Sequence, residues 1–334
     1  MKERVIIDCD TGIDDALALV LALSRPELDI VGITTVAGNV DVENTTRNTC
    51  NVVHLLGRDD IRIAKGEPKP LEREPLRASG VHGVTGLRGY TFDSDWKENL
   101  LDIHAVEFMK RLLEESDEKT TIIAIGPVTN VAKLLIEHPE VKDRIRRIVF
   151  MGTSYHCGNP TPVSTFNVLV DPEAFRKVIF SGVEFVACPL EVTKTATIEP
   201  DEVERLDAMG TPVARFAASI IRGYGITKIG ADEKIDTANE EVISENRLKA
   251  AKESNEVTMH DPATIAYVID PSLFTTAKYY CDVECKGELT TGFTLIDKND
   301  YYKKEDDERN LTLMESIDRP RFIDLFLDSV RRYG

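Results

Sequence analysis

The feature that most constrains the fold of this chain is the alternation of short, apolar, β-rich runs with longer amphipathic runs. The β-rich runs are predicted strands at Arg4–Asp10, Asp29–Ala37, Ile61–Ala64, Thr121–Ile125, Ile145–Met151 and Val183–Ala187. The amphipathic runs are predicted helices at Asp14–Ser24, Asn44–Gly57, Ile103–Glu115, Thr129–His138 and Pro172–Ser181. This alternation predicts an α/β fold in which a mainly parallel sheet is flanked by helices on both faces.

The second half of the chain is less regular. Helices are expected at Pro200–Met209, Val213–Gly223, Pro262–Ile269 and Arg321–Arg332. Two late strands, Lys278–Glu284 and Thr291–Asp297, can pair as a small hairpin. The highly charged stretch Asp232–Glu256 is a solvated helix, a mobile lid or a disordered insertion. Because no repeat or low-complexity linker interrupts the chain, residues 1–334 are expected to form a single domain.

Charge and hydropathy exclude several classes of function. The chain has 58 acidic and 41 basic side chains, a net charge of −17, and no Lys/Arg-rich stretch, so it should repel nucleic acid and anionic membranes. Its longest apolar run, Ala16–Leu23, is far shorter than the roughly 20 residues that span a bilayer. The six cysteines include no C-x-x-C pair and are expected to be reduced thiols. We therefore expect a soluble, cytoplasmic protein.

Four carboxylates, Asp8, Asp10, Asp14 and Asp15, directly follow or end the first predicted strand. Strand alternation places Asp8 and Asp10 on one side, and Gly12 permits a tight turn that returns Asp14 and Asp15 toward them. Repulsion between partly buried carboxylates raises their pKa values or recruits a cation. Because the ligand atoms are oxygens, the cation should be Ca²⁺ or Mg²⁺, with Ca²⁺ favoured if a carbonyl and waters also contribute.

Two alternatives compete for this cluster. Asp14 and Asp15 also suit the positive end of a helix, at about 0.3–1 kcal/mol each, but that explains two carboxylates and not four. Phosphohydrolases of the haloacid-dehalogenase type, which depend on Mg²⁺, also carry Asp-x-Asp after their first strand. They have Thr or Val two residues after the second Asp, where this chain has Gly12, so this alternative is less favoured.

The segment from Asp8 to Asp15 resembles the signature Asp-x-Asp-x-Gly-x-Asp-Asp of the inosine-uridine type of nucleoside hydrolases. Further matches follow in order at 36–40 (VAGNV), 81–87 (VHGVTGL), 124–130 (AIGPVTN), 151–152 (MG), Asn159, 166–167 (FN), 170–174 (VDPEA) and 260–262 (HDP). Each match alone is modest, but the ordered set is specific.

The resemblance implies a nucleoside hydrolase fold with a Rossmann-like core, a tightly bound Ca²⁺, and hydrolysis of ribonucleosides to free base and ribose. It implies a catalytic base, Asp14, and a residue that faces the leaving base, His260. The implied metal ligands are Asp10, Asp15, the carbonyl oxygen of Ile125 and Asp261, supported by Asp8. The implied substrate contacts are Asn39, His82, Met151, Asn159, Thr165, Phe166 and Asn167. Family members are commonly oligomers, so a homodimer or homotetramer is expected.

The residues suit this chemistry independently of the resemblance. Cleavage of an N-glycosidic bond needs an activated water, a clamp for the sugar hydroxyls and a proton for the leaving base. A hard dication lowers the pKa of its bound water, a carboxylate such as Asp14 accepts the proton, and Asn side chains match a diol. His260 can protonate a base nitrogen. The alternative for His260 and its neighbours is a plain helix start, with Asp261 as the N-cap and Pro262 as the first helical residue.

One position departs from the family pattern. The residue before Phe166 is commonly Glu in the family, where it helps bind ribose, and here it is Thr165. The loss of a charge-assisted hydrogen bond costs about 1.5–3 kcal/mol if nothing replaces it, so a nucleoside-binding protein without turnover, or one with an altered substrate, is an alternative. Tyr224, and less so Trp96, are candidates for stacking on the base.

Overall fold

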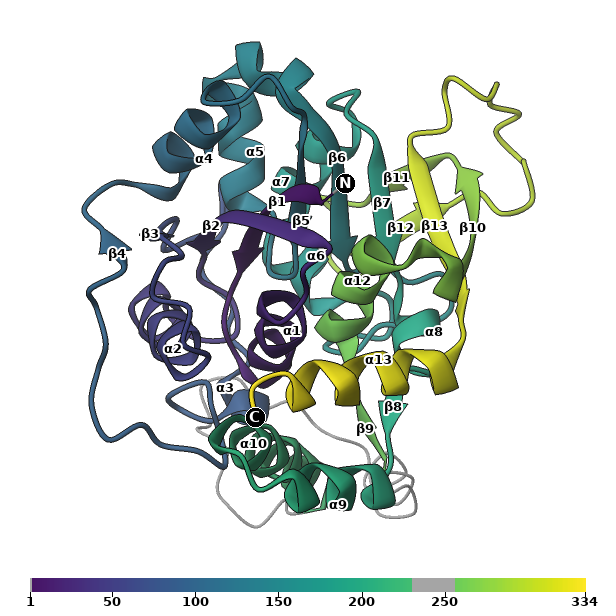
Figure 1. Ribbon diagram of the computed structural model, residues 1–334. Helices are drawn as coiled ribbons and strands as arrows, with labels where there is room; N and C mark the ends of the chain where they lie inside the picture. The colour runs from purple at the N-terminus through teal and green to yellow at the C-terminus, as the bar shows by residue number, and fades with distance from the viewer. Residues whose placement is uncertain (1, 230–255) are drawn as a thin grey trace.

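The computed structural model describes residues 2–229 and 256–334, which are built around a nine-stranded sheet (Figure 1). Neighbouring strands are parallel except β10, which is antiparallel to β13 at one edge. In spatial order the strands are β10 (Phe274–Tyr279), β13 (Leu311–Ile317), β7 (Phe185–Cys188), β6 (Ile145–Met151), β5 (Thr120–Ala124), β1 (Glu3–Cys9), β2 (Leu28–Thr35), β3 (Ile63–Lys65) and β4 (Leu100–Leu101). The predicted α/β class with a mainly parallel sheet is confirmed.

Helices cover both faces of this sheet. Strand β1 shows why, because Val5, Ile7 and Cys9 enter one apolar cluster while Ile6 enters the other. The first cluster is completed by α1 (Ile13–Leu23), α2 (Val42–Leu55), α9 (Pro200–Met209), α10 (Pro212–Ile229), α12 (His260–Ile269) and α13 (Arg319–Arg331). The second is completed by α4 (Ala105–Glu114), α5 (Thr129–Glu137) and α7 (Pro172–Ile179). The remaining short helices are α3 (Ser79–His82), α6 (Phe166–Val170), α8 (Leu190–Thr193), η1 (Pro139–Arg144) and η3 (Pro271–Leu273).

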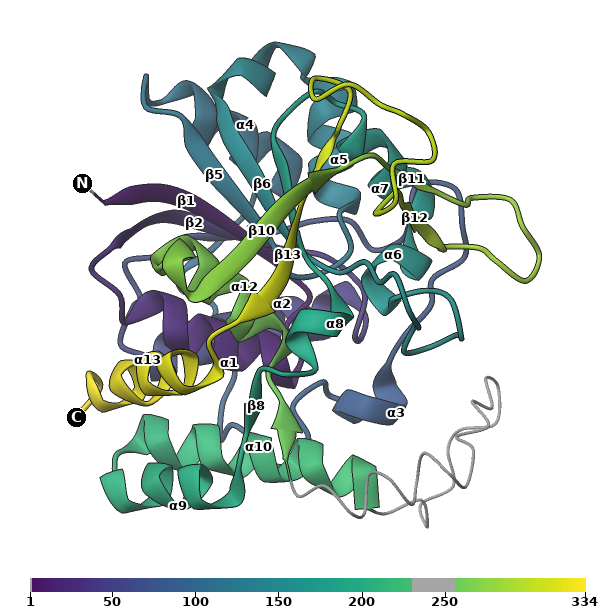
Figure 2. The ribbon, with the colours of Figure 1, turned by 90° about the vertical axis from the view of Figure 1, so that its right-hand side faces the viewer.

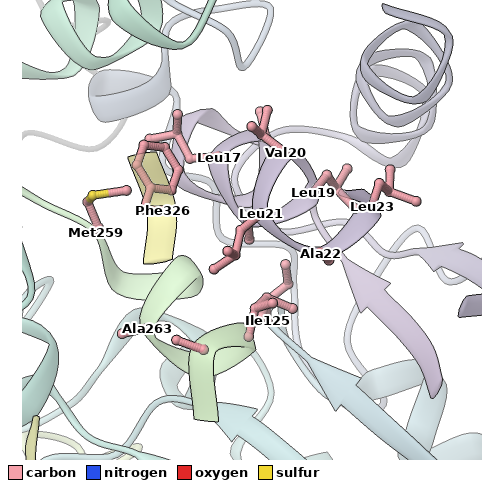
Figure 3. Close-up of a cluster of buried hydrophobic side chains, with 14 of the residues drawn as sticks. Leu17, Leu19, Val20, Leu21, Ala22, Leu23, Ile125, Met259, Ala263 and Phe326 are labelled. Carbon is pink, nitrogen blue, oxygen red and sulfur yellow. The ribbon is translucent and has the colours of Figure 1, made fainter. Parts of the chain in front are cut away.

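Helix α1 is buried along its whole length, as expected for a helix that is apolar on every side after its first turn. It packs against α12 and α13, and Figure 3 shows Leu17 and Leu21 of α1 in one cluster with Ala263 and Phe326 of those helices. Helices α1 and α12 both begin with residues predicted to act at the site. Their packing therefore brings two distant parts of the sequence together.

The late strands differ from the prediction. The single strand expected at Lys278–Glu284 is split after Tyr279: β10 joins the edge of the main sheet, and β11 (Cys281–Val283) pairs with β12 (Thr294–Ile296) as the expected hairpin. Strand β13, which was not predicted, lies beside β10 (Figure 2) and separates it from β7. Its pairing partners lie far away in the sequence, so local pattern alone did not reveal it. A second small sheet joins β8 (Thr197–Ile198) to β9 (Val257–Thr258).

The described residues also bear on two other expectations. All six cysteines are free thiols, in agreement with the prediction of reduced cysteines. Within residues 2–229 and 256–334, no helix combines the length and the apolar character needed to cross a bilayer. Most of the charged stretch predicted to be a helix, lid or insertion, residues 232–255, lies outside the described residues.

Candidate active site

The acidic loop lies at the carboxyl end of β1, between the last strand residue, Cys9, and the first residue of α1, Ile13. Asp15 closes this loop on itself. Its Oδ1 accepts a hydrogen bond from the backbone N of Asp10 (3.0 Å), and its Oδ2 accepts one from the backbone N of Gly12 (3.0 Å). A carboxylate at this position of a helix satisfies exposed backbone N–H groups and matches the positive end of the helix. Helix capping thus accounts for Asp15, but for none of the other three carboxylates.

Asp261, from the start of α12, joins this loop. Asp14, Asp15 and Asp261 are all buried, and each places one carboxylate oxygen within 4.8 Å of those of the other two. This group is the candidate metal cluster found among the described residues. Asp10 does not belong to this group of three carboxylates, although the negative charges of Asp15 and Asp14 help to raise the pKa of its carboxyl group. The structure therefore brings together Asp14, Asp15 and Asp261, while the division into base and ligands stays a prediction.

The carboxylates of this cluster cannot all be charged at low energetic cost without a counter-charge. Burial, followed by the negative charge of Asp14, raises the pKa of Asp15 to about 7. Burial is also the largest cause that raises the pKa of Asp10 and of Asp261 well above the usual range, and the neighbouring carboxylates add to it. A divalent cation would reverse this effect by favouring the charged forms.

The carboxylate of Asp10 is wedged between two backbone segments. A Cβ added at Gly38 would lie 2.1 Å from Asp10 Oδ2, and one added at Gly126 would lie 2.7 Å from Asp10 Oδ1. Gly38 follows β2 and Gly126 follows β5, so Asp10 sits where the carboxyl ends of three adjacent strands meet. In a parallel sheet this edge is the usual place for a ligand.

The donor set fits a hard divalent cation. The Oδ1 atoms of Asp10 and Asp14 are buried and have no hydrogen-bond partner among the described residues. Buried polar atoms normally have partners, so these two oxygens suit a bound cation. The carbonyl oxygen of Ile125 accepts a hydrogen bond from Asn167 Nδ2 (2.8 Å), and a carbonyl has a second lone pair that can bind a cation. Because all of these atoms are oxygens, a hard ion is favoured over zinc or copper.

Asp8 has a separate environment. Its Oδ1 accepts hydrogen bonds from Thr34 Oγ1 (2.6 Å) and Asn130 Nδ2 (2.8 Å), while its buried Oδ2 has no partner among the described residues. Burial raises the pKa of Asp8 to about 7. Asp8 therefore links β1 to β2 and α5, as a residue that supports the acidic loop.

Asp261 does not cap α12. The helix begins at His260, its N-cap is Met259, and no side-chain capping bond is formed there. Two other Asp-Pro pairs do cap: Asp171 accepts a hydrogen bond from Ala174 N, and Asp270 accepts one from Ser272 N. The alternative of a plain capping residue is therefore wrong for Asp261, whose carboxylate turns toward the acidic loop instead.

The residues predicted to contact the sugar surround the same end of the sheet. Asn39 donates from its backbone N to Asp10 Oδ2 (2.7 Å) and from Nδ2 to Asp15 Oδ2 (2.9 Å), so it also braces the acidic loop. Asn167 Nδ2 donates to the carbonyl oxygens of Ile125 (2.8 Å) and Met151 (3.1 Å).

The loop after β6 carries the rest of the predicted sugar contacts. Asn159 Oδ1 accepts from the backbone N of Phe166 (2.9 Å), and Thr165 Oγ1 accepts from the backbone N of Thr153 (3.2 Å). Their roles toward ribose stay predictions.

His82 and Tyr224 meet on another side of the cluster. His82 Nδ1 accepts a hydrogen bond from the backbone N of Ile13 (3.1 Å) and lies 3.9 Å from Asp14 Oδ1. Because Nδ1 accepts, the ring is neutral and no ion pair with Asp14 forms, in agreement with the lowering of the pKa of His82 by burial. The rings of His82 and Tyr224 stack at 6.0 Å, and the charges of Asp14 and Asp261 help burial to raise the pKa of Tyr224.

Comparison of the chain with known proteins agrees with this geometry. The sequence model of a protein family described as "Inosine-uridine preferring nucleoside hydrolase" matches residues 5–324. The chain belongs to this family. The pyrimidine-specific ribonucleoside hydrolase RihA of Shigella boydii is 40% identical over 336 residues, covering 100% of both chains, and that of Escherichia coli O1:K1 has the same identity and coverage. The predicted family is confirmed.

Solved structures support the same conclusion for this nucleoside hydrolase. A plant nucleoside hydrolase and a purine-preferring ribonucleoside hydrolase from Gardnerella vaginalis each match with a TM-score of 0.86 at 26% identity, over 99% of both chains. The protein is therefore a hydrolase that acts on N-glycosyl compounds, and the phosphohydrolase alternative is wrong.

Trp96 has another role in this nucleoside hydrolase. Its ring stacks on His54 of α2, with centroids 3.7 Å apart and planes 11° apart, and its backbone N donates to Asn51 Oδ1 (2.7 Å). The Trp96 ring is thus used for packing on α2, unlike Tyr224, which lies beside His82.

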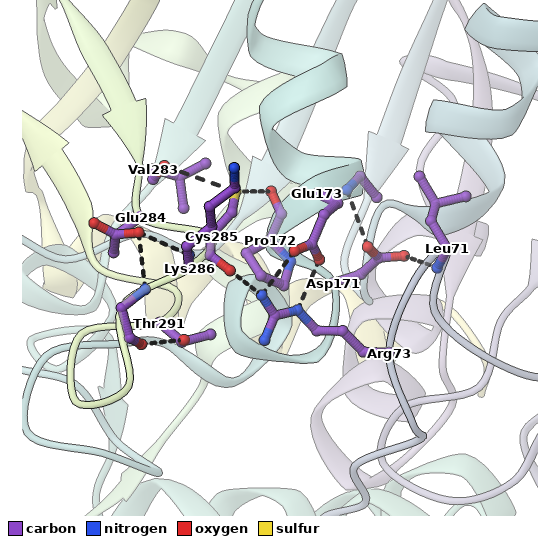
Figure 4. A network of polar contacts seen from close by, with 12 residues as sticks. Leu71, Arg73, Asp171, Pro172, Glu173, Val283, Glu284, Cys285, Lys286 and Thr291 are labelled. Atoms are coloured by element: carbon purple, nitrogen blue, oxygen red, sulfur yellow. Dashed lines mark hydrogen bonds and ion pairs between the residues drawn. The ribbon is translucent and has the colours of Figure 1, made fainter.

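The segment between β3 and α3, which leads to His82, is fastened to the start of α7 (Figure 4). The backbone N of Leu71 donates to Asp171 Oδ2 (2.8 Å), and Arg73 makes two hydrogen bonds to Glu173, both 2.7 Å. Arg73 also donates to the carbonyl oxygen of Cys285. A bidentate, half-buried ion pair of this kind is stronger than an exposed one, so it fixes the position of the chain segment that leads to His82.

Asn48 of α2 was missed by the sequence reasoning. Its buried Nδ2 donates to the carbonyl oxygens of Thr11 (3.0 Å) and Thr85 (2.8 Å), and so joins the acidic loop to the loop after His82. A signal for it existed: residues 44–51 (NTTRNTCN) are poor helix formers in a predicted helix, which indicates polar side chains with other roles.

Proposed function

We propose that this protein hydrolyses the N-glycosidic bond of ribonucleosides, that Ca²⁺ is its bound cation, and that pyrimidine ribonucleosides are its preferred substrates. The observation that carries the proposal is the buried triple of Asp14, Asp15 and Asp261 in a chain of the nucleoside hydrolase family. Oxygen ligands with two unpartnered buried oxygens, on Asp10 and Asp14, support a hard cation, and several carboxylates together with a carbonyl favour Ca²⁺ over Mg²⁺.

Asp10, Asp15, Asp261 and the Ile125 carbonyl would hold the cation. When bound, the cation lowers the pKa of a water molecule and orients the vicinal hydroxyls of ribose. Asp14 accepts the proton of the attacking water, since its Oδ1 is buried without a hydrogen-bond partner among the described residues. His260 donates a proton to the leaving base, because a base anion is a poor leaving group.

The remaining predicted contacts fall into two groups. Asn159 and Asn167, with Asn39 and Met151, bind the sugar hydroxyls or line the pocket around them. His82 and Tyr224, whose rings already stack, lie toward the base. The pyrimidine preference follows the names of the relatives that are 40% identical, against 26% for the purine-preferring structure.

Release of reducing sugar from cytidine, uridine, inosine, adenosine and guanosine tests the proposal. The protein is stripped of metal, and Ca²⁺ or Mg²⁺ is then returned. Activity should be lost on stripping, return with Ca²⁺, and be highest on cytidine and uridine. Faster release from the purine nucleosides would overturn the pyrimidine preference alone, and no release from any nucleoside with Ca²⁺ bound would overturn the proposed activity.

A matched pair of variants tests the site itself. Asp261→Asn removes one carboxylate of the triple, whereas Asp270→Asn changes an Asp-Pro aspartate that directly follows α12 and caps η3, where Asn also caps well. The first variant should lose the response to Ca²⁺, and the second should keep it. Equal responses would remove Asp261 from the metal site.

The second candidate function is hydrolysis of an altered substrate, because Thr165 stands where the family commonly has a ribose-binding Glu. Stabilisation of the protein by cytidine or uridine without release of sugar would favour this second function.

We also propose a cytoplasmic homodimer or homotetramer; light scattering of the purified protein measures the oligomeric state directly.

A further inference from the structure

Thr193 contacts His260 although the two lie far apart in the sequence. Thr193 is the last residue of α8 and is fully buried, and its Oγ1 lies 2.7 Å from Nδ1 of His260, the first residue of α12. This is the length of a short, well-formed hydrogen bond. No motif in the sequence singles out Thr193.

A small β ribbon fixes the two residues opposite each other. Strand β8 follows α8 and strand β9 precedes α12, and the two strands pair antiparallel, with Thr197 opposite Thr258. The backbone N of Met259, directly before His260, donates to the carbonyl oxygen of Ala196 (2.8 Å). This ribbon joins the end of α8 to the start of α12 (Figure 1), so backbone pairing holds Thr193 and His260 near each other in addition to the side-chain contact.

The other end of α8 is tied to the sugar side of the site. The backbone N of Leu190 donates to the carbonyl oxygen of Thr153 (3.1 Å), and the backbone N of Thr153 donates to Thr165 Oγ1 (3.2 Å). Thr153 has φ 75°, a left-handed conformation that is costly for a β-branched residue. This conformation directs its two backbone groups to α8 and to Thr165. Hydrogen bonds therefore connect Thr165, Thr153, α8 and His260.

One arrangement of protons satisfies both contacts of the Thr193 hydroxyl. Thr193 Oγ1 also lies 3.4 Å from the carbonyl oxygen of Leu190, to which only the hydroxyl can donate. With its single proton directed there, Thr193 Oγ1 accepts a hydrogen bond from Nδ1–H of His260. In the doubly protonated ring, the proton available for a leaving base is then the one on the other ring nitrogen, Nε2.

We propose that Thr193 is a positioning residue that sets the orientation of the His260 ring, and thereby which ring nitrogen meets the leaving base. This inference rests on the proposed function, in which His260 donates that proton. Loss of the Thr193 hydroxyl lets the ring turn, which slows proton donation while leaving the sugar contacts in place. The effect should therefore fall on kcat and not on KM.

The test compares Thr193→Val, which keeps the shape and removes the hydroxyl, with Thr193→Ser, which keeps the hydroxyl. Thr193→Val should lower kcat on cytidine and uridine about tenfold, roughly the worth of one such hydrogen bond, and Thr193→Ser should restore most of the rate. p-Nitrophenyl riboside, whose leaving group needs no proton, should be hydrolysed by Thr193→Val at the wild-type rate. In the His260→Ala background, Thr193→Val should cause no further loss.

Thr195→Val is the matched control. The Thr195 hydroxyl also bonds to the carbonyl oxygen three residues earlier, that of Val192 (2.7 Å), but Thr195 is exposed. The activity of the Thr195→Val variant should equal that of the wild type. Wild-type kcat in Thr193→Val, or an equal loss on the nucleosides and on p-nitrophenyl riboside, would overturn the inference.

A measurement without turnover separates this inference from the proposed function. ¹⁵N–¹H correlation spectra of the imidazole rings, with His260 assigned by comparison with His260→Ala, report which nitrogen carries the proton. The Nδ1–H signature should be present in the wild type and lost in Thr193→Val. Its absence from the wild type would refute the hydrogen-bond direction, whereas inactivity of the wild type on every nucleoside would refute the proposed function.

Discussion

Replacement of Gly38 by alanine should damage the acidic cluster through a single methyl group. The added Cβ would lie 2.1 Å from Asp10 Oδ2, 2.9 Å from Asp10 Cγ and 3.0 Å from Pro127 Cδ. Contacts under 3.0 Å force something to move, and Asp10 is almost completely buried, so its carboxylate has little room. When it moves, it loses the hydrogen bond from the backbone N of Asn39 (2.7 Å).

Two costs then add. Overpacking of a tight site costs about 1–3 kcal/mol, and an unpaired buried hydrogen-bonding group costs about 1–3 kcal/mol more. For a chain of this length, about 2–6 kcal/mol in total corresponds to a decrease in Tm of roughly 3–9 °C. Because Asp10 is a predicted ligand, the stabilisation by Ca²⁺ should also decrease, by about 1.4 kcal/mol for each tenfold loss of affinity.

Thermal unfolding with a chelator, and again with saturating Ca²⁺, measures both effects. Gly80→Ala is the matched control: Gly80 lies in a helical turn, and nothing lies within 4 Å of its added Cβ. It should keep the wild-type Tm and the wild-type shift with Ca²⁺. If Gly38→Ala behaves like Gly80→Ala in both conditions, the reasoning about the Asp10 environment is refuted.

Three further predictions concern other parts of the site. Burial raises the pKa of Asp8 to about 7 in the folded protein. Between its ordinary pKa of 3.8 and about 7, the folded state therefore holds a proton that the unfolded chain has released. The metal-free protein should lose stability, on the order of 4 kcal/mol from this group, as the pH rises from about 4 to 7. Asp8→Asn should remove this part of the pH dependence in urea unfolding, and an unchanged pH profile would contradict it. Thr165→Glu should lower KM for ribonucleosides about tenfold if Thr165 replaces a ribose-binding carboxylate, and an unchanged or higher KM would reject that idea. His260→Ala should lose most of its activity on nucleosides but little on p-nitrophenyl riboside; equal losses on the two substrates would remove His260 from the role of acid.

Many strand and helix positions in the first half of the chain could be predicted because the pattern there is local. The strand at Ile145–Met151 was predicted with the bounds that the structure shows, and the first two helices shifted by one or two residues. The turn at Gly12 and the return of Asp15 to Asp10 also follow from neighbouring residues. Strand β13 could not be predicted in this way, because its position depends on pairing with β7 and β10, and β7 lies far away in the sequence.

The residues of the candidate site also differ in whether their neighbours in the sequence reveal their role. Asp10, Asp14 and Asp15 lie within six residues, so their repulsion and their demand for a cation could be read from the sequence. The role of Asp261 could not be decided from its neighbours, because Asp-Pro also starts helices, as Asp171 and Asp270 show. The family resemblance singled it out, and the packing of α12 against α1 brought its carboxylate to the loop.

An α/β sheet with a group of carboxylates after its first strand can be inferred from the sequence alone, since periodicity and the density of carboxylates are properties of short segments. Three contacts appear only in the folded chain: Asp261 joins the acidic cluster, Asn48 and Arg73 fasten the loops around His82, and Thr193 meets His260. The physical reason is that a hydrogen bond or ion site acts over a few ångströms in space, whereas its partners are set by the packing of helices and the pairing of strands over the whole chain.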